Sequence, residues 1–139
     1  MSFMEVLLPV FVQVILTFVV AFVLGYRRYS AVRAGELRGK ITLREANWPP
    51  YARQAEYNYL NQFELPVLFY VLMILLLITR KADYIMIMLA WIFVALRIVH
   101  AFIHLTTNKI ELRGPIFFVG ALVLTIMWGL FIVDVIRVH

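Results

Sequence analysis

Four long runs of apolar residues, separated by segments that hold most of the charge, dominate the pattern of this chain. The runs extend over about residues 6–24, 57–79, 84–105 and 116–136. Each run has about 20 residues, which is enough for a helix to cross roughly 30 Å of hydrocarbon. The pattern predicts an all-α integral membrane protein, a four-helix bundle that forms one domain over residues 1–139.

Composition agrees with a membrane environment. Hydrophobic residues make up 64% of the chain and charged residues only 15%, whereas about a quarter of a soluble domain is charged. Cysteine is absent, so a disulfide, a thiolate metal site and a cysteine nucleophile are excluded. Any thiol chemistry must therefore use a thiol that a ligand brings.

The basic residues predict an orientation. Most of them fall after the first and third runs, and by the positive-inside rule we expect that side to be cytoplasmic, with both termini on the opposite side. The basic segment of about residues 27–50 either only sets this topology and contacts anionic lipid, or also supplies arginines to a ligand. The residues on the basic side are Arg27, Arg28, Arg33, Arg38, Lys40, Arg44, Arg53, Lys109 and Arg113.

Polar and ionisable residues interrupt the second and third runs. In each run they are spaced by three and four positions, so they share one helix face. Ionisable groups inside a membrane span are costly and usually mark a site with a partner nearby. The two faces consist of Tyr57, Asn61 and Glu64 in the second run and Arg97, His100 and His104 in the third.

The two faces are expected at a similar depth. The short turn at residues 80–83 makes the two helices an antiparallel hairpin. At the rise of an α-helix, Glu64 lies roughly 10 Å and Arg97 about 12 Å from the same membrane surface. We therefore predict a Glu64–Arg97 ion pair, or a network that includes it, in a cavity that opens toward the cytoplasm.

The chemistry of these groups leaves two readings. Polar groups do hold membrane helices together, at about 1 kcal/mol or less each, so the cluster could serve packing alone. Carboxylate, guanidinium, imidazole, amide and phenol groups at one level also suit a small zwitterionic or anionic ligand. Adjacent lipid would then give an apolar second substrate direct access.

Several motifs resemble the MAPEG family, the membrane-associated proteins in eicosanoid and glutathione metabolism. Asn61-Gln62-Phe63-Glu64, with Pro66 just after it, is similar to the N-x-x-E signature of that family. Arg97-Ile98-Val99-His100 and Arg113-Gly114-Pro115 resemble its third helix and the start of its fourth. Four spans and a long basic first loop match as well, so the resemblance covers nearly the whole chain.

The resemblance implies a homotrimer with glutathione bound between subunits on the cytoplasmic side, acting as a transferase or peroxidase on lipophilic substrates. Arg28 would reach a glutathione carboxylate across the interface. Phe117 stands where transferases usually carry a thiolate-stabilising arginine, and Arg113 one turn earlier is the candidate substitute. The implied catalytic residues are Arg113 and Arg97, and the implied binding residues are Arg28, Arg53, Tyr57, Asn61, Glu64, His100 and His104.

Other functions stay open at this point. The chain could bind a lipid or another ligand without catalysis, or it could be a small multidrug-type transporter that uses Glu64 as its proton carrier. His100 and His104, one turn apart, could join Glu64 in a metal site, although the neighbouring Arg97 disfavours a cation. No metal and no nucleic-acid partner is expected.

Overall fold

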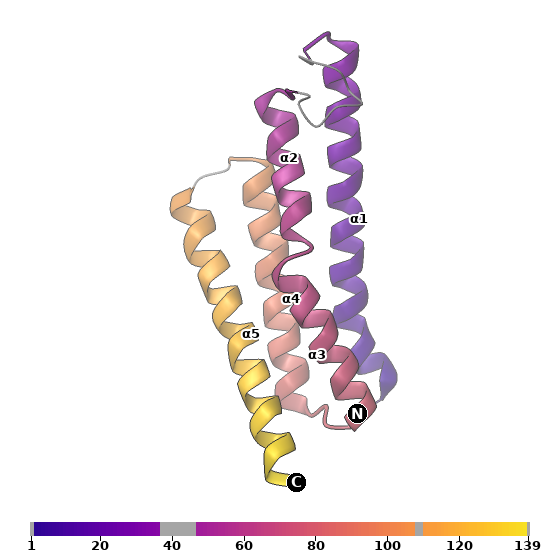
Figure 1. Cartoon of the computed structure of the whole chain (residues 1–139), viewed down its shortest axis with the longest axis vertical. Helices are drawn as coiled ribbons and strands as arrows, with labels where there is room; N and C mark the ends of the chain where they lie inside the picture. The colour runs from indigo at the N-terminus through magenta and orange to yellow at the C-terminus, as the bar shows by residue number, and fades with distance from the viewer. Residues whose placement is uncertain (1, 37–46, 108–109, 139) are drawn as a thin grey trace.

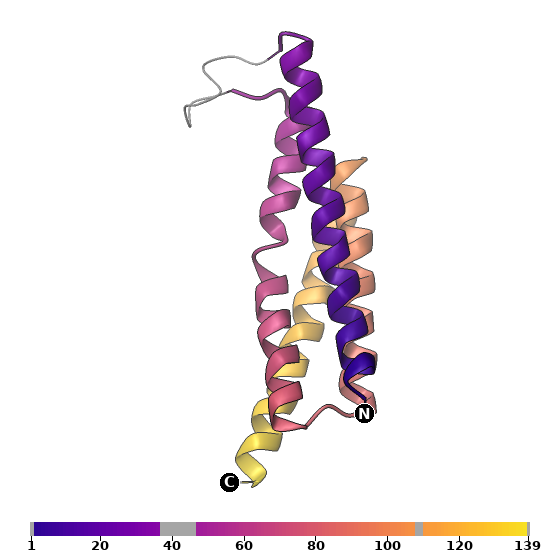
Figure 2. The same cartoon turned by 90° about the vertical axis from the view of Figure 1, so that its right-hand side faces the viewer.

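A computed structural model describes residues 2–36, 47–107 and 110–138, and these residues form a bundle of α-helices (Figures 1 and 2). The helices are α1 (Phe3–Arg33), α2 (Pro50–Asn61), α3 (Leu65–Thr79), α4 (Tyr84–Leu105) and α5 (Ile110–Val138). Because α2 and α3 follow one another end to end, the described residues form four helical stretches that are long and apolar enough to cross a membrane. The all-α, multi-pass fold that the sequence predicts is thus confirmed.

The two ends of the bundle differ. The end of α1, the start of α2, the end of α4 and the start of α5 lie at one end of the bundle, which we call the loop end (Figure 1). Both termini and the α3–α4 turn lie at the other, the terminal end. This arrangement is the one that the charge pattern predicts, while its orientation in a membrane stays a prediction. Four basic residues used for that prediction lie outside the described residues: Arg38, Lys40, Arg44 and Lys109.

Two helices are longer than the apolar runs predict. α1 continues beyond Leu24 to Arg33, so the first connection is shorter than expected. α5 begins at Ile110, which places Pro115 inside the helix rather than at its start. An apolar run marks only the part of a helix that lies in hydrocarbon, and a helix continues into water where capping groups and local propensity allow it.

The second span is broken where the sequence predicts one helix over residues 57–79. It starts earlier, at Pro50, and is interrupted after Asn61. Pro66 has no N–H to donate to the carbonyl of Gln62, and a proline disfavours helical geometry in the residue before it. The end of α2 tightens accordingly, with the Phe63 amide donating to the Leu60 carbonyl at 3.0 Å. Glu64 follows in a non-helical conformation, with φ −99° and ψ −102°.

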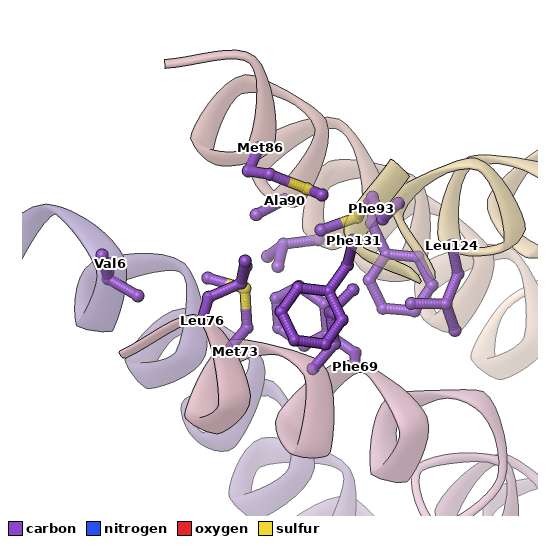
Figure 3. Packing of buried hydrophobic residues seen from close by; sticks show 12 residues of the cluster. Val6, Phe69, Met73, Leu76, Met86, Ala90, Phe93, Leu124 and Phe131 are labelled. Carbon is purple, nitrogen blue, oxygen red and sulfur yellow. The ribbon is translucent and has the colours of Figure 1, made fainter. Parts of the chain in front are cut away.

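The break divides the interior of the bundle into two halves. Toward the terminal end, α3, α4 and α5 pack an apolar core with Val6 of α1 (Figure 3). Phe69 and Phe93 stack there with ring centroids 4.9 Å apart. Toward the loop end the buried side chains include polar ones, and in a membrane such groups must find partners within the protein. The buried polar residues are Gln13, Asn58, Gln62, Arg97, His100 and His104.

Candidate functional site

A cavity of about 500 Å³ lies in the loop-end half of the bundle. α4 forms its floor, and α2 and α5 form its sides, because α2 and α5 both pack on α4. Figure 1 shows α4 lying between the other two helices at this level. The cavity is lined by Tyr57, Leu60, Asn61, Glu64, His100, His104, Arg113, Gly114 and Phe117.

The structure brings six of the predicted site residues together in this cavity. Tyr57, Asn61 and Glu64 come from α2 and the break that follows it, while His100 and His104 come from the last two turns of α4. Arg113 adds a guanidinium from the start of α5. The structure thus brings most of the two predicted helix faces together around one cavity, and the roles of these residues stay predictions.

The predicted Glu64–Arg97 ion pair is wrong. Among the described residues no carboxylate lies within ion-pair distance of Arg97, and its Nη2 donates a hydrogen bond to the backbone carbonyl of Asn61 at 3.2 Å. Arg97 is only 2% exposed and does not line the cavity. The break explains the difference, because it ends α2 at Asn61 and leaves a terminal carbonyl, which a cation stabilises.

The other two predicted arginines lie outside the cavity of their own chain. Arg28 forms an ion pair with Glu56 at 3.1 Å, and its guanidinium lies 5.2 Å from the ring centroid of Trp48. Arg53 donates a hydrogen bond to the side chain of Asn47. Both groups lie near the loop end, between α1 and α2, so within one chain they do not reach the cavity.

A buried chain of amide side chains, which we call the amide ladder, was missed from the sequence. Gln13 of α1 donates to the Gln62 side chain at 3.1 Å, and Gln62 donates to the Asn58 side chain at 3.2 Å. Asn58 donates to the backbone carbonyl of Ala101 in α4 at 3.0 Å. The signal for it was present in the sequence, because Asn58 and Gln62 are spaced by four and share a helix face next to the one that carries Tyr57 and Asn61.

The direction of the amide ladder follows from its α4 end. A backbone carbonyl only accepts hydrogen bonds, so Asn58 must donate there and accept from Gln62, and Gln62 must accept from Gln13. The free oxygen then falls on Gln13, whose Oε1 is buried and has no hydrogen-bond partner in the described structure. The ladder ties the α2 side of the break to both α1 and α4.

The C-terminus of α4 is capped by side chains from other helices. Arg27 donates to the carbonyls of Leu105 at 2.7 Å and Tyr51 at 3.0 Å. Gln54 donates to the carbonyl of His104. The last carbonyls of a helix need such donors where water is scarce. These bonds join the last turn of α4, which carries His104 of the cavity lining, to α1 and α2.

The cavity combines hydrogen-bonding groups with an apolar wall. The His100 and His104 rings lie edge to face at 5.9 Å, and Phe117 packs on His100 at 5.7 Å. Both histidines are almost fully buried, whereas Glu64 is exposed. Within the described ranges no group of three or more His, Cys, Asp or Glu side chains is placed to hold a metal ion.

Comparison with known proteins assigns the family. The MAPEG family model matches residues 6–133, which is nearly the whole chain. No curated protein and no solved structure matches it significantly. The family match, the four membrane-crossing stretches and the cavity motifs from α2, α4 and α5 agree. The chain is therefore a multi-pass integral membrane protein that belongs to the MAPEG family.

Proposed function

We propose that the chain binds glutathione in the cavity between α2, α4 and α5 and uses its thiol on lipophilic substrates at the cytoplasmic side of the membrane. The MAPEG family includes glutathione transferases, peroxidases and lipid-metabolism proteins. The observation that carries the proposal is the joint placement of Asn61, Glu64 and Arg113 in one cavity. Its volume of about 500 Å³ lies in the usual range for small-molecule sites.

The groups in the cavity complement the parts of glutathione. The Glu64 carboxylate suits the ammonium group of the ligand, and the Arg113 guanidinium suits a carboxylate or the thiolate. Asn61 and Tyr57 offer hydrogen bonds to the peptide groups. Because a charge-assisted hydrogen bond is about twice as strong as a neutral one, Glu64 and Arg113 are expected to contribute most of the affinity.

The proposed reaction starts with formation of the glutathione thiolate. The thiol gives its proton to water, and the resulting thiolate is stabilised by the Arg113 cation. In a transferase the sulfur electron pair forms a bond to an electrophilic carbon, and the leaving group departs with its own electron pair. In a peroxidase the thiolate attacks the terminal oxygen of a hydroperoxide, and the O–O bond breaks to give a sulfenic acid and an alkoxide. The alkoxide takes up the proton that the thiol gave to water and becomes an alcohol. The thiol of a second glutathione then reacts with the sulfenic acid, which forms the disulfide and releases water.

The apolar wall of the cavity supports a lipophilic second substrate. Leu60 and Phe117 line it and are exposed on helices that face lipid. A substrate dissolved in the bilayer would therefore reach the thiolate without crossing water.

The same proposal includes a homotrimer, which the family resemblance suggests. Arg28 lies outside the cavity of its own chain, beside Glu56 and Trp48. In a trimer Arg28 of one subunit would bind a glutathione carboxylate in the cavity of its neighbour, and Arg53 is the second candidate for this role.

Calorimetric titration of the protein in detergent with glutathione tests the proposal. We expect Glu64→Gln and Asn61→Ala to weaken binding by about tenfold, which corresponds to about 1.4 kcal/mol. Asp134→Asn is the matched control, because it makes a similar change at the terminal end, where Asp134 pairs with Lys81 at 3.4 Å. Absence of binding by the unmodified protein would overturn the proposal.

A non-catalytic binding protein is the second candidate. It is favoured by Phe117, which occupies the cavity wall where the resemblance places an arginine. Ultraviolet absorbance of the thiolate separates the two candidates. A catalyst raises the thiolate fraction of bound glutathione in an Arg113-dependent way, whereas a simple binding protein leaves the thiol protonated.

A further inference from the structure

We propose that Arg97 is a positioning residue, which holds the break between α2 and α3 and thereby places Asn61 and Glu64 in the cavity. The expected effect of Arg97 on glutathione binding rests on the proposed function, whereas the placement of Arg97 at the break does not. Arg97 is among the largest fully buried side chains of the described structure. It lies outside the cavity lining, so it acts through other residues.

The first argument concerns the backbone at the break. In an unbroken helix the Asn61 carbonyl would accept a hydrogen bond from the amide of residue 65. Here α3 starts at Leu65, and the Asn61 carbonyl receives a long 3.4 Å bond from the Glu64 amide. Arg97 Nη2 supplies the second donor at 3.2 Å. Arg97 therefore strengthens the hydrogen bonding of a carbonyl that the break leaves poorly satisfied.

The second argument concerns charge. A guanidinium stays ionised in a protein, and burial of an unpaired charge is expensive. No carboxylate of the described residues lies within ion-pair distance of Arg97, and Glu64 interacts with it electrostatically only at longer range. The direct hydrogen-bond partner of Arg97 is the C-terminal end of α2, which carries the negative end of the helix dipole. An unbroken helix over residues 50–79 would not offer this end, so the break and the buried arginine stabilise each other.

The third argument is that the break is held from two sides. The amide ladder fixes Gln62 to α1 through Gln13 and to α4 through Asn58. Arg97 fixes the neighbouring Asn61 to α4. With Gln62 and Asn61 both held, Asn61 and Glu64 keep their places in the cavity lining. Loss of Arg97 removes the hydrogen bond that joins the Asn61 carbonyl to α4.

A double-mutant cycle on glutathione affinity tests the positioning role. We expect Arg97→Met to weaken binding by about tenfold, and Glu64→Gln to lose most of its effect in that background, because Glu64 is no longer held in place. Arg97→Lys, which keeps the charge and a donor, should recover part of the affinity. Independent effects, in which the two fold-changes multiply, would overturn the inference.

Arg27→Met is the matched control variant. Arg27 also donates from a guanidinium to helix carbonyls, at Tyr51 and Leu105, and it lies outside the cavity. It should lower the unfolding temperature as Arg97→Met does. The effect of Glu64→Gln on affinity should persist in the Arg27→Met background. If the role of Arg97 were purely structural, the effect of Glu64→Gln would persist in the Arg97→Met background as well.

Amide hydrogen exchange of the ligand-free protein separates this inference from the proposed function. Arg97→Met should accelerate exchange at residues 62–65 and 67 by about tenfold or more relative to α5, and Arg27→Met should leave exchange at these residues unchanged. Unchanged exchange at the break in Arg97→Met overturns the inference. If the protein binds no glutathione, the exchange rates at the break alone decide whether Arg97 holds the break. If Arg97→Met does not fold, the exchange measurement is made on Arg97→Lys.

Discussion

Arg80 adopts a backbone conformation that its side chain disfavours. It ends α3 with φ 56° and ψ 36°, in the left-handed region, and it is the single non-glycine residue with positive φ among the described residues. The Lys81 amide donates back to the Leu76 carbonyl at 3.2 Å, which closes the helix end. Glycine is the usual residue at such a position because it has no Cβ.

Replacement of Arg80 by glycine is therefore expected to stabilise the protein. The Arg80→Gly variant should gain about 1 kcal/mol in unfolding free energy, because the left-handed conformation costs a side chain about that much. Gly35→Ala is the converse control, since Gly35 has φ +72°, and it should lose a similar amount. Thermal unfolding in detergent measures both, and equal effects of the same sign would contradict the argument.

The candidate site was predictable from residue spacing only in part. Spacings of three and four brought Asn61, Glu64, His100 and His104 to the correct faces and depth. The partner of Arg97 was not predictable, because depth along a helix does not reveal that a break exposes a carbonyl. The role of Arg28 was not predictable from spacing for another reason, because it depends on a second subunit and spacing describes one chain only.

At the scale of elements, the accuracy of the prediction depends on what ends each helix. The span predicted at residues 84–105 agrees with α4, because Asp83 caps its start by accepting from the Met86 amide at 2.9 Å. The second span was predicted as one helix although Pro66 lies inside it. Hydropathy does not register such a break, because it averages side-chain polarity over a window and carries no information on backbone conformation.

The amide ladder also belongs to this scale, and its direction predicts unequal effects of two similar substitutions. Gln62→Leu leaves a Gln13 donor and an Asn58 acceptor unpaired and should cost about 1–3 kcal/mol of unfolding free energy. Gln13→Leu leaves one Gln62 acceptor unpaired but removes the already unpaired Gln13 Oε1. It should therefore cost much less.

Thermal unfolding of the two single variants and the double variant checks this order. The double variant Gln13→Leu/Gln62→Leu should be more stable than Gln62→Leu alone, because it removes both partners of one hydrogen bond. Equal losses for the two single variants would mean that the ladder runs in no defined direction.

At the scale of the whole molecule, the apolar core and the buried polar groups occupy different halves of the bundle. The terminal half has the apolar core of α3, α4 and α5 (Figure 3). The loop half holds the buried polar groups and the cavity. Substitutions in the core, such as Phe93→Ala, should lower stability by roughly 3–5 kcal/mol. Glutathione affinity of the folded fraction, measured by titration, should stay unchanged, and a parallel loss would show that the halves are coupled.

The position of both termini at one end of the bundle (Figure 2) allows three copies to be joined in a single polypeptide through flexible linkers. Such a concatenated chain makes each subunit separately mutable. If Arg28 serves a neighbouring cavity, Arg28→Met and Glu64→Gln placed in the same copy should disable two of three glutathione sites. Placed in adjacent copies so that they meet in one cavity, they should disable one. The reverse pattern, with one site lost when both changes are in the same copy and two sites lost when they are in adjacent copies, would confine Arg28 to its own subunit.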